Sequence, residues 1–210
     1  MRLILVRHGE TEWNRQGRIV GHTEIALNET GRKQAELLAQ ALRNEKVSAI
    51  YASPLQRTRE TAAEISQVLG VAVTFDDALK EIAAGDIDGM TFEEVAERHS
   101  DFFKVWMKGD PLLRLPGGES FTDLRNRTWP AVQRIVGKHG DGDVIVVSHT
   151  LAIMSIISSA MGMDIANFRR IRLNVASISI LEFKDRNVSL LLFNDTCHWK
   201  GLERIEGRVL

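Results

Sequence analysis

The sequence predicts an α/β fold built around a mostly parallel sheet. Five short apolar runs are typical of buried strands, and each of the first three is followed by a segment with helical periodicity. The expected strands are Leu3–Val6, Val47–Ala52, Val144–Ser148, Ala176–Phe183 and Val188–Asn194. Because strand–helix–strand units join parallel strands by right-handed crossovers, the first three strands should be parallel. Only residues 184–187 separate the last two strands, which predicts a hairpin at one edge.

Five segments carry the periodicity and the end signals of helices. They are Asn28–Leu42, Pro54–Leu69, Thr91–His99, Ser120–His139 and Leu151–Met161. Asn28 is a candidate N-cap of the first helix, and Gly70 follows the end of the second. Ser120 and Asp123 form a variant of the capping box at the start of the fourth. Pro130 lies inside that helix and is expected to kink it or split it in two.

Length and composition are those of one large globular domain. The chain has 210 residues, of which 44% are hydrophobic and 26% charged, enough to bury a full core. We therefore expect a single domain over residues 1–210. Residues 82–119 are rich in glycine and are interpreted as an insertion that shapes the site rather than as a second domain.

Charge and cysteine content exclude several classes of partner. With 27 basic and 28 acidic residues the net charge is −1, so no global field would recruit nucleic acid or an anionic membrane. The single cysteine, Cys197, excludes an internal disulfide and a cysteine-rich metal site. The apolar run at the N-terminus is too short for a signal peptide, and residues 151–163 are too few to span a bilayer. A cytoplasmic location is expected, and the oligomeric state, monomer or homodimer, stays open.

Each of the first three strand-to-helix junctions carries a cationic or reactive side chain. Arg7 and His8 end the first strand, Arg57 begins the helix after the second, and His149 follows the third. Because the carboxyl ends of parallel strands meet at one edge of a sheet, we expect these residues to converge. Two arginines, two imidazoles and helix N-termini around a small volume describe a phosphate pocket.

Each of these residues also has an ordinary structural explanation. Arg57 on a polar helix is typical of a solvated charge. A histidine between an apolar strand and an apolar helix, such as His149, is typical of a hydrogen-bonded core residue. Their joint occurrence at three equivalent positions of the topology favours a common site.

Seven motifs in order resemble those of the histidine phosphatase superfamily and extend over nearly the whole chain. The first three are Arg7-His8-Gly9-Glu10-Thr11 with Asn14, Gly21-x-x-Glu24-x-x-Leu27-x-x-x-Gly31-x-x-Gln34-Ala35, and Ser53-x-Leu55-x-Arg57-Thr58-x-x-Thr61-Ala62. The others are Leu79-x-Glu81 with Gly85 and Gly89, Pro116-Gly117-Gly118-Glu119-Ser120, Ser148-His149, and Asn194-Asp195-Thr196-x-His198. The chain is most similar to the short phosphatases of this superfamily, which include α-ribazole, phosphoserine and broad-specificity enzymes.

The resemblance implies a fold and a reaction. The fold would be phosphoglycerate-mutase-like, a three-layer α/β/α sandwich whose mostly parallel sheet has one antiparallel edge strand. The reaction would be hydrolysis of phosphomonoesters of small metabolites, without metal or cofactor. His8 would attack phosphorus and carry a phosphohistidine intermediate. Arg7, Arg57 and His149 would hold the phosphoryl oxygens, and Glu81 would protonate the leaving oxygen and then activate water.

Substrate contacts are expected from a second set of residues. By the resemblance, Asn14 helps to position the phosphoryl group, and Gly21, His22 and Thr150 complete the substrate-binding set. Thr23, the 82–119 segment and His198 are expected to line the leaving-group side together with His22. The sequence does not identify the substrate itself.

Some positions leave the assignment open. Asp86 and Asp88 compete with Glu81 for the acid role, and a surface carboxylate is the ordinary explanation of Glu81. Three residues depart from the family pattern: Glu24 replaces the common Asp, Ala26 the usual Pro, and Thr150 a frequent Gly. A β-branched residue at position 150 would be strained if its φ were positive.

Three other functions have weaker support in the sequence. Cofactor-dependent phosphoglycerate mutases of this family carry an aromatic, basic run beside the acid, whereas residues 82–84 here are Ile-Ala-Ala. A non-catalytic phospholigand-binding member would lack the nucleophile or the acid, and both are present. A metal hydrolase using His8, His22, His149 and His198 has no supporting ligand spacing.

Overall fold

A six-stranded mixed sheet forms the centre of the molecule. The computed structural model describes residues 1–140, 142–164, 171–185 and 187–199. The strands are β1 (Arg2–Arg7), β2 (Val47–Ala52), β3 (Val73–Phe75), β4 (Asp143–Ser148), β5 (Ile178–Lys184) and β6 (Asn187–Asp195), in the order β3-β2-β4-β1-β5-β6. Strands β3, β2, β4 and β1 are parallel, β5 is antiparallel to β1, and β6 is antiparallel to β5. This confirms the predicted mostly parallel sheet with an antiparallel edge.

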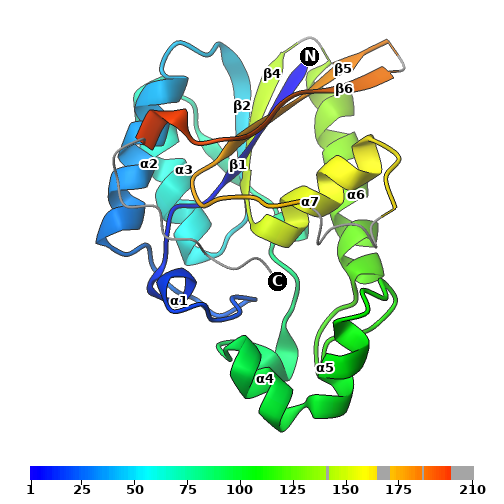
Figure 1. The fold of residues 1–210 in the computed structure, drawn as a ribbon. Helices are drawn as coiled ribbons and strands as arrows, with labels where there is room; N and C mark the ends of the chain where they lie inside the picture. The colour runs from blue at the N-terminus through cyan, green and yellow to red at the C-terminus, as the bar shows by residue number, and fades with distance from the viewer. Residues whose placement is uncertain (141, 165–170, 186, 200–210) are drawn as a thin grey trace.

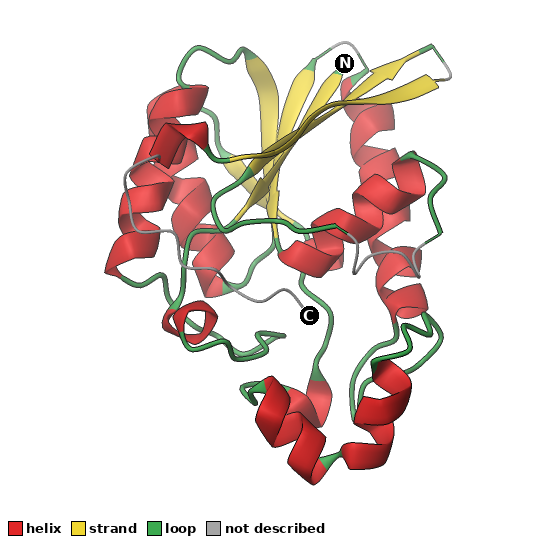
Figure 2. Ribbon diagram, in the orientation of Figure 1, coloured by secondary structure: helices red, strands yellow, loops and turns green. Residues whose placement is uncertain are grey.

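Helices cover both faces of the sheet and form the expected three layers. The helices are α1 (Glu12–Arg15), α2 (Glu29–Leu42), α3 (Gln56–Leu69), α4 (Phe92–Arg98), α5 (Ser100–Trp106), α6 (Phe121–His139) and α7 (Thr150–Ala160). Helices α2 and α3 lie on one face, and α6 and α7 lie on the other (Figure 1; Figure 2). Within the described part of the chain, no helix is both long and apolar enough to cross a membrane.

The apolar run of β1 is explained by burial on both faces. Successive side chains of a strand point to opposite faces of the sheet. Leu3 and Leu5 join the cluster beneath α6 and α7, whereas Ile4 and Val6 join the cluster beneath α2 and α3. A parallel strand that is buried on both faces therefore reads as a continuous apolar run rather than an alternating one.

Of the two outcomes expected at Pro130, a kink or a split, the split does not occur in helix α6. It runs without interruption from Phe121 to His139. Proline removes the hydrogen bond to the carbonyl of Asn126, four residues earlier. Both residues are exposed, so this carbonyl lies on the solvent side of the helix, where water can satisfy it.

Several short elements were not predicted from the sequence. Helix α1 has four residues and β3 has three, which is too short for a repeating apolar pattern to be distinguished from a loop. Helix α5, of seven residues, was also not predicted. The second predicted helix starts at Gln56, two residues later than expected, while Gly70 ends it with a positive φ of 68° as a left-handed cap.

The 82–119 segment contributes α4 and α5. Both helices lie beyond the carboxyl ends of the parallel strands (Figure 1). The rings of Phe92 and Trp106 stack with centroids 5.5 Å apart and hold the two helices together. The division of the chain into one domain with this insertion stays a prediction.

Two glycines allow the start of α2 to approach the loop after β1. A side chain at Gly9 would overlap the carbonyl oxygen of Gly31, and a side chain at Gly31 would overlap the backbone of Glu10. The contact is tied by hydrogen bonds from Glu10 N to Gln34 Oε1 at 2.9 Å and from Asn28 N to Glu10 O at 3.0 Å. The loop that carries His8 is therefore fixed by the packing of backbone on backbone.

This contact predicts a destabilising substitution. Gly31→Ala should lower the free energy of unfolding by about 1–3 kcal/mol, because both partners are backbone atoms that cannot rotate away. The matched control is Gly137→Ala in α6, where a Cβ meets nothing within 4 Å. This substitution should raise the free energy of unfolding by about 0.5–1 kcal/mol. Urea denaturation measures both values, and equal stability of the two variants would contradict the proposed contact.

Candidate active site

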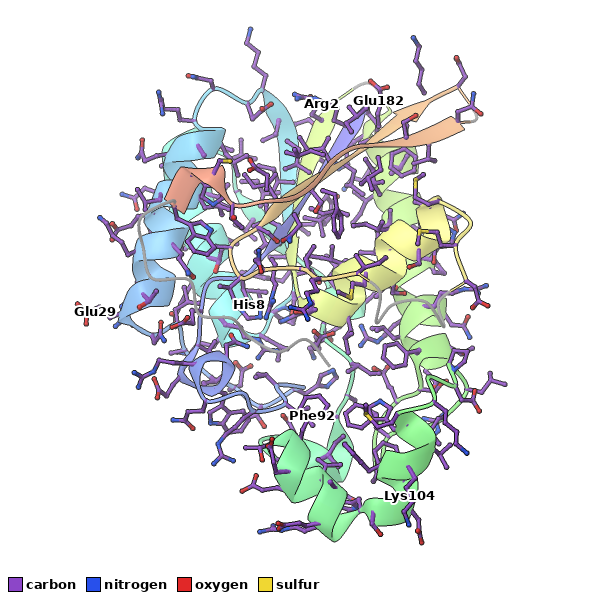
Figure 3. The ribbon with its side chains drawn as sticks, in the orientation of Figure 1. Arg2, His8, Glu29, Phe92, Lys104 and Glu182 are labelled. Atoms are coloured by element: carbon purple, nitrogen blue, oxygen red, sulfur yellow. The ribbon has the colours of Figure 1, made fainter. Side chains whose placement is uncertain are left out.

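The backbone of His8 is fixed at the carboxyl end of β1. Its N–H donates to the carbonyl of Ser148 at 3.1 Å, and its carbonyl accepts from the N–H of Ala176 at 2.9 Å. The next residue, Gly9, donates its N–H to Thr61 Oγ1 at 3.1 Å. His8 therefore occupies one defined position at the edge of the sheet (Figure 3).

The imidazole of His8 is neutral and presents one free nitrogen. The ring is buried, and its Nδ1 lies 2.7 Å from the carbonyl oxygen of Gly9. Because a carbonyl only accepts, Nδ1 carries the proton and the Nε2 lone pair is available. Burial lowers the pKa of His8 well below 6.5, and the charges of Arg57 and Arg7 lower it further.

Arg57 and His149 form a hydrogen-bonded pair beside His8. Arg57 Nε donates to His149 Nδ1 at 3.2 Å, so the proton of the neutral imidazole is on Nε2, which lies 2.8 Å from Ser53 Oγ. The rings of His149 and His8 meet edge to face with centroids 5.2 Å apart. Burial lowers the pKa of His149 well below 6.5, with a further contribution from Arg57. Two neutral imidazoles and a guanidinium thus share one buried volume.

The remaining contacts of Arg57 are to backbone carbonyls. Nη1 donates to Thr23 O at 3.1 Å, and Nη2 donates to Gly21 O at 2.7 Å. The residue has no exposed surface, and burial lowers its pKa to about 10 even though Glu81 and Asp88 raise it. The side chain is therefore held in one orientation, and none of its partners in the described part of the chain is a carboxylate.

Arg7 adds a second, partly buried charge to the site. Its Nη1 donates to the carbonyl of Leu173, while its buried Nε has no hydrogen-bond partner. Burial lowers its pKa to about 10. Among the described residues, neither Arg7 nor Arg57 has a carboxylate oxygen within 4 Å. Buried, uncompensated positive charge with an unsatisfied donor favours binding of an anion.

The carboxyl group of Glu81 caps helix α7. Its Oε2 accepts from Leu151 N at 3.1 Å, and its Oε1 accepts from Ala152 N at 3.2 Å and from Ile82 N at 2.9 Å. The N-cap residue of α7, His149, makes no side-chain capping bond. Because Glu81 satisfies the first N–H groups of the helix instead, the imidazole of His149 is free to face the site.

The same carboxyl group is poised to hold a proton. Burial raises the pKa of Glu81 above its ordinary 4.5, although the N–H groups of Ile82 and Leu151 and the charges of Arg57 and Arg7 oppose this shift. A raised pKa keeps a larger fraction of the group protonated at neutral pH. Glu81 is thereby suited to give a proton to a leaving group.

A pocket opens where these side chains meet. Five residues that the sequence singled out line it: Arg7, His8, Asn14, Glu81 and Thr150. The rest of its described lining comes largely from loops around Ile19 and Val175 and from Phe92 of α4. These loop residues were not predicted, because segments without regular structure carry no periodic signal.

Other predicted residues lie behind the pocket or away from it. Gly21, His149 and Arg57 stand behind the lining. His22 donates from Nε2 to the carbonyl of Glu81 at 2.7 Å, and it does not line the pocket; nor does Thr23. The expected role of these residues on the leaving-group side stays a prediction.

His198 also lies outside the lining of the pocket. It belongs to a short 3₁₀ helix, η4 (Cys197–Trp199), which packs near α2. In the described residues no group of three or more His, Cys, Asp or Glu side chains is placed to hold a metal ion.

Asp86 and Asp88, the alternative candidates for the acid, contact the backbone of loops. Asp88 accepts from the backbone N–H groups of Gly21 at 2.8 Å and Thr23 at 3.1 Å. Asp86 lies against the backbone of Gly117. Neither aspartate lines the pocket, whereas Glu81 does. The geometry therefore favours Glu81 over both aspartates as the acid.

Two of the three residues that depart from the family pattern can be explained by the structure. Glu24 accepts the N–H of Gln56 at 2.7 Å and so caps α3, whose N-cap residue makes no side-chain capping bond. Thr150 is the first residue of α7, and its φ is not positive, so the β-branched side chain is not strained there. Nothing in the structure explains Ala26.

A family model described as histidine phosphatase superfamily (branch 1) matches residues 3–196. The chain belongs to the histidine phosphatase superfamily. Phosphoserine phosphatase 1 of Hydrogenobacter thermophilus is 37% identical over 198 residues, 94% of each chain. A probable phosphoglycerate mutase of Yersinia pestis is 31% identical over 185 residues, 88% of this chain and 86% of the other.

A solved structure of the histidine phosphatase superfamily has the same fold. Phosphoserine phosphatase of Entamoeba histolytica, in complex with 3-phosphoglyceric acid, matches with a TM-score of 0.85 and 30% identity. The match covers 94% of this chain and 98% of that one. The predicted phosphoglycerate-mutase-like fold and the prediction that the chain is a histidine phosphatase are confirmed.

The position of Arg57 in this histidine phosphatase predicts weaker binding of a phosphoryl mimic when the residue is changed. Arg57→Met should reduce affinity for vanadate and kcat/KM by about 10- to 100-fold for each charge-assisted hydrogen bond lost. Arg59→Met, on the exposed side of α3, is the matched control and should leave both unchanged. Vanadate inhibition that is unaltered in a folded Arg57→Met enzyme would remove Arg57 from the site.

Proposed function

We propose that the protein is a metal-independent phosphomonoesterase that hydrolyses small phosphorylated metabolites through a phosphohistidine on His8. One observation carries the proposal. A neutral imidazole with a free Nε2 lies in a pocket of uncompensated arginine charge, and a carboxyl group of raised pKa also lines that pocket. These are the nucleophile, the anion site and the acid that phosphoryl transfer requires.

The arginines retain donors for the phosphoryl oxygens. A guanidinium has five N–H donors. Among the described contacts, Arg57 uses one N–H at each of its three nitrogens, and Arg7 uses one N–H, to Leu173. The unused donors would bind the substrate dianion and the charge that builds on its equatorial oxygens.

In the first half-reaction His8 Nε2 attacks phosphorus. The N–P bond forms while the P–O bond to the alcohol breaks, and the proton of Glu81 moves to the leaving oxygen. The Nδ1–H of His8 stays on the carbonyl of Gly9, which stabilises the cationic ring of the phosphohistidine. The alcohol then departs and leaves Glu81 ionised.

In the second half-reaction Glu81 acts as a base. It takes a proton from a water molecule whose oxygen attacks phosphorus, and the N–P bond breaks. Inorganic phosphate leaves, His8 regains its lone pair and Glu81 its proton, so the cycle closes without any other group.

The substrate class is supported by the relatives. Two of them are named phosphoserine phosphatase, which act on a small phosphomonoester. The similarity to a probable phosphoglycerate mutase favours mutase activity as a second candidate. The two functions differ in product, because a phosphatase releases inorganic phosphate and a mutase returns an isomeric phosphate ester.

The nucleophile can be trapped directly. After brief mixing with a ³²P-labelled phosphomonoester in the presence of EDTA, label that survives alkali and is lost in acid should be found on His8. His8→Ala should abolish the label and reduce turnover by roughly 10³-fold or more. Near-normal turnover of His8→Ala would refute the mechanism, and turnover that EDTA removes and zinc restores would favour a metal hydrolase.

The role of Glu81 predicts a dependence on the leaving group. Glu81→Gln should reduce kcat/KM for alkyl phosphates by about 10²–10⁴-fold, because a basic alkoxide needs a proton to leave. It should reduce kcat/KM for 4-nitrophenyl phosphate far less, because nitrophenolate leaves without one.

The pH profile supplies an independent check of the same role. Because the pKa of His8 lies below 6.5, the nucleophile is already neutral at that pH. The pKa of Glu81 is raised, so its ionisation sets the decline of kcat/KM at high pH. Glu81→Gln should lack this decline. Equal losses on both esters with an unchanged profile would contradict acid catalysis by Glu81.

A further inference from the structure

One arginine outside the pocket holds the loop that carries Glu81. Arg127 projects from α6, and its Nη1 donates to the carbonyls of Ala78 at 3.0 Å and Lys80 at 2.7 Å. Its Nη2 donates to the carbonyl of Glu81 itself at 2.6 Å. A single guanidinium thus binds three of four consecutive carbonyls that end at the acid.

Glu119 binds Arg127 and also contacts the chain on the far side of Glu81. Its Oε1 accepts from Arg127 Nε at 2.8 Å, and its Oε2 accepts from Arg127 Nη2, also at 2.8 Å. Oε2 further accepts the N–H of Ala83 at 2.9 Å. The Glu119–Arg127 ion pair therefore binds the chain on both sides of Glu81. Its planar two-point geometry restricts the orientation of both side chains.

The loop depends on these side chains because it has little regular structure of its own. The preceding 3₁₀ helix, η1 (Asp77–Leu79), ends before it, and the next, η2 (Gly85–Ile87), begins after it. His22 adds one more bond to the carbonyl of Glu81. All of these bonds go to the backbone, so the carboxyl group remains on the N-terminus of α7 and faces the pocket.

We propose that Arg127 and Glu119 are positioning residues that hold the acid–base carboxyl group of Glu81 at the distance proton transfer requires. The inference rests on the proposed function of Glu81. Neither residue lines the pocket, so both act through Glu81. The side chains of the pair are about one-fifth exposed, and their bonds to backbone groups on both sides of Glu81 restrict the position of that residue. A displacement near 1 Å at a reacting group costs roughly 10²-fold in rate.

The test compares two arginines of α6. Arg127→Met should lower kcat/KM for an alkyl phosphate by about 10- to 100-fold. It should lower kcat/KM for 4-nitrophenyl phosphate less than about threefold, because that ester does not need the acid. Arg125→Met, on the exposed side of the same helix, is the control and should change neither value. Arg127→Lys keeps a cation with three N–H donors and should recover part of the loss.

A double mutant shows whether Arg127 acts through Glu81. In the Glu81→Gln background, Arg127→Met should cause no further loss on the alkyl ester, because the group that it positions is already absent. Equal losses on both esters in Arg127→Met, or full additivity in the double mutant, would overturn the positioning role. If Glu81→Gln itself shows no preference between the esters, the acid assignment fails, and the two failures are thereby distinguished.

A milder variant covers the case in which Arg127→Met does not fold. Glu119→Gln removes the charge and keeps the size of the side chain. It should show the same selective loss on the alkyl ester, with circular dichroism and thermal unfolding confirming the fold. A folded Glu119→Gln enzyme with unchanged kcat/KM on both esters would overturn the proposal for Glu119.

Discussion

The site depends on the hydrogen bonds between the carboxyl group of Glu81 and the N-terminus of α7. This carboxyl group satisfies the N–H groups of Leu151 and Ala152, and this frees the side chain of His149 from capping. The contact also balances two opposing effects on one proton. Helix N–H groups and nearby arginines favour the carboxylate, whereas burial favours the acid and dominates. A carboxyl group in this balance can give and take a proton within one cycle.

The strand order explains why residues far apart in the chain meet there. Strand β4 pairs with β1, which brings His149 beside His8, and β2 pairs with β4, which brings Arg57 into the same volume. All three junctions lie at one edge because the three strands are parallel. Among the described residues no carboxylate contacts Arg7 or Arg57, and backbone carbonyls hold both side chains; such groups cost stability that the two apolar clusters must offset.

The meeting of His8, Arg57 and His149 could be predicted from the sequence because each lies beside a strongly apolar strand. The apolar run of β1 and the motif after it locate His8, and the same logic locates Arg57 and His149. Arg127 could not be given a role in this way, because its partners are carbonyls some fifty residues away in a loop, and no pattern encodes such contacts. That Pro130 leaves α6 unsplit could not be predicted for a related reason, since its exposure depends on packing that the local sequence does not state.

A bound phosphomonoester would change the balance on Glu81 in the direction that the reaction needs. Its negative charge would offset the arginines that now lower the pKa of Glu81, so the acid would hold its proton more firmly as the substrate binds. In the proposed mechanism Glu81 has given up its proton once the phosphoryl group is on His8 and the alcohol has left, and the carboxylate can then accept a proton from water. In the proposed mechanism the same two arginines therefore bind the anion and also lower the pKa of Glu81 before the substrate arrives.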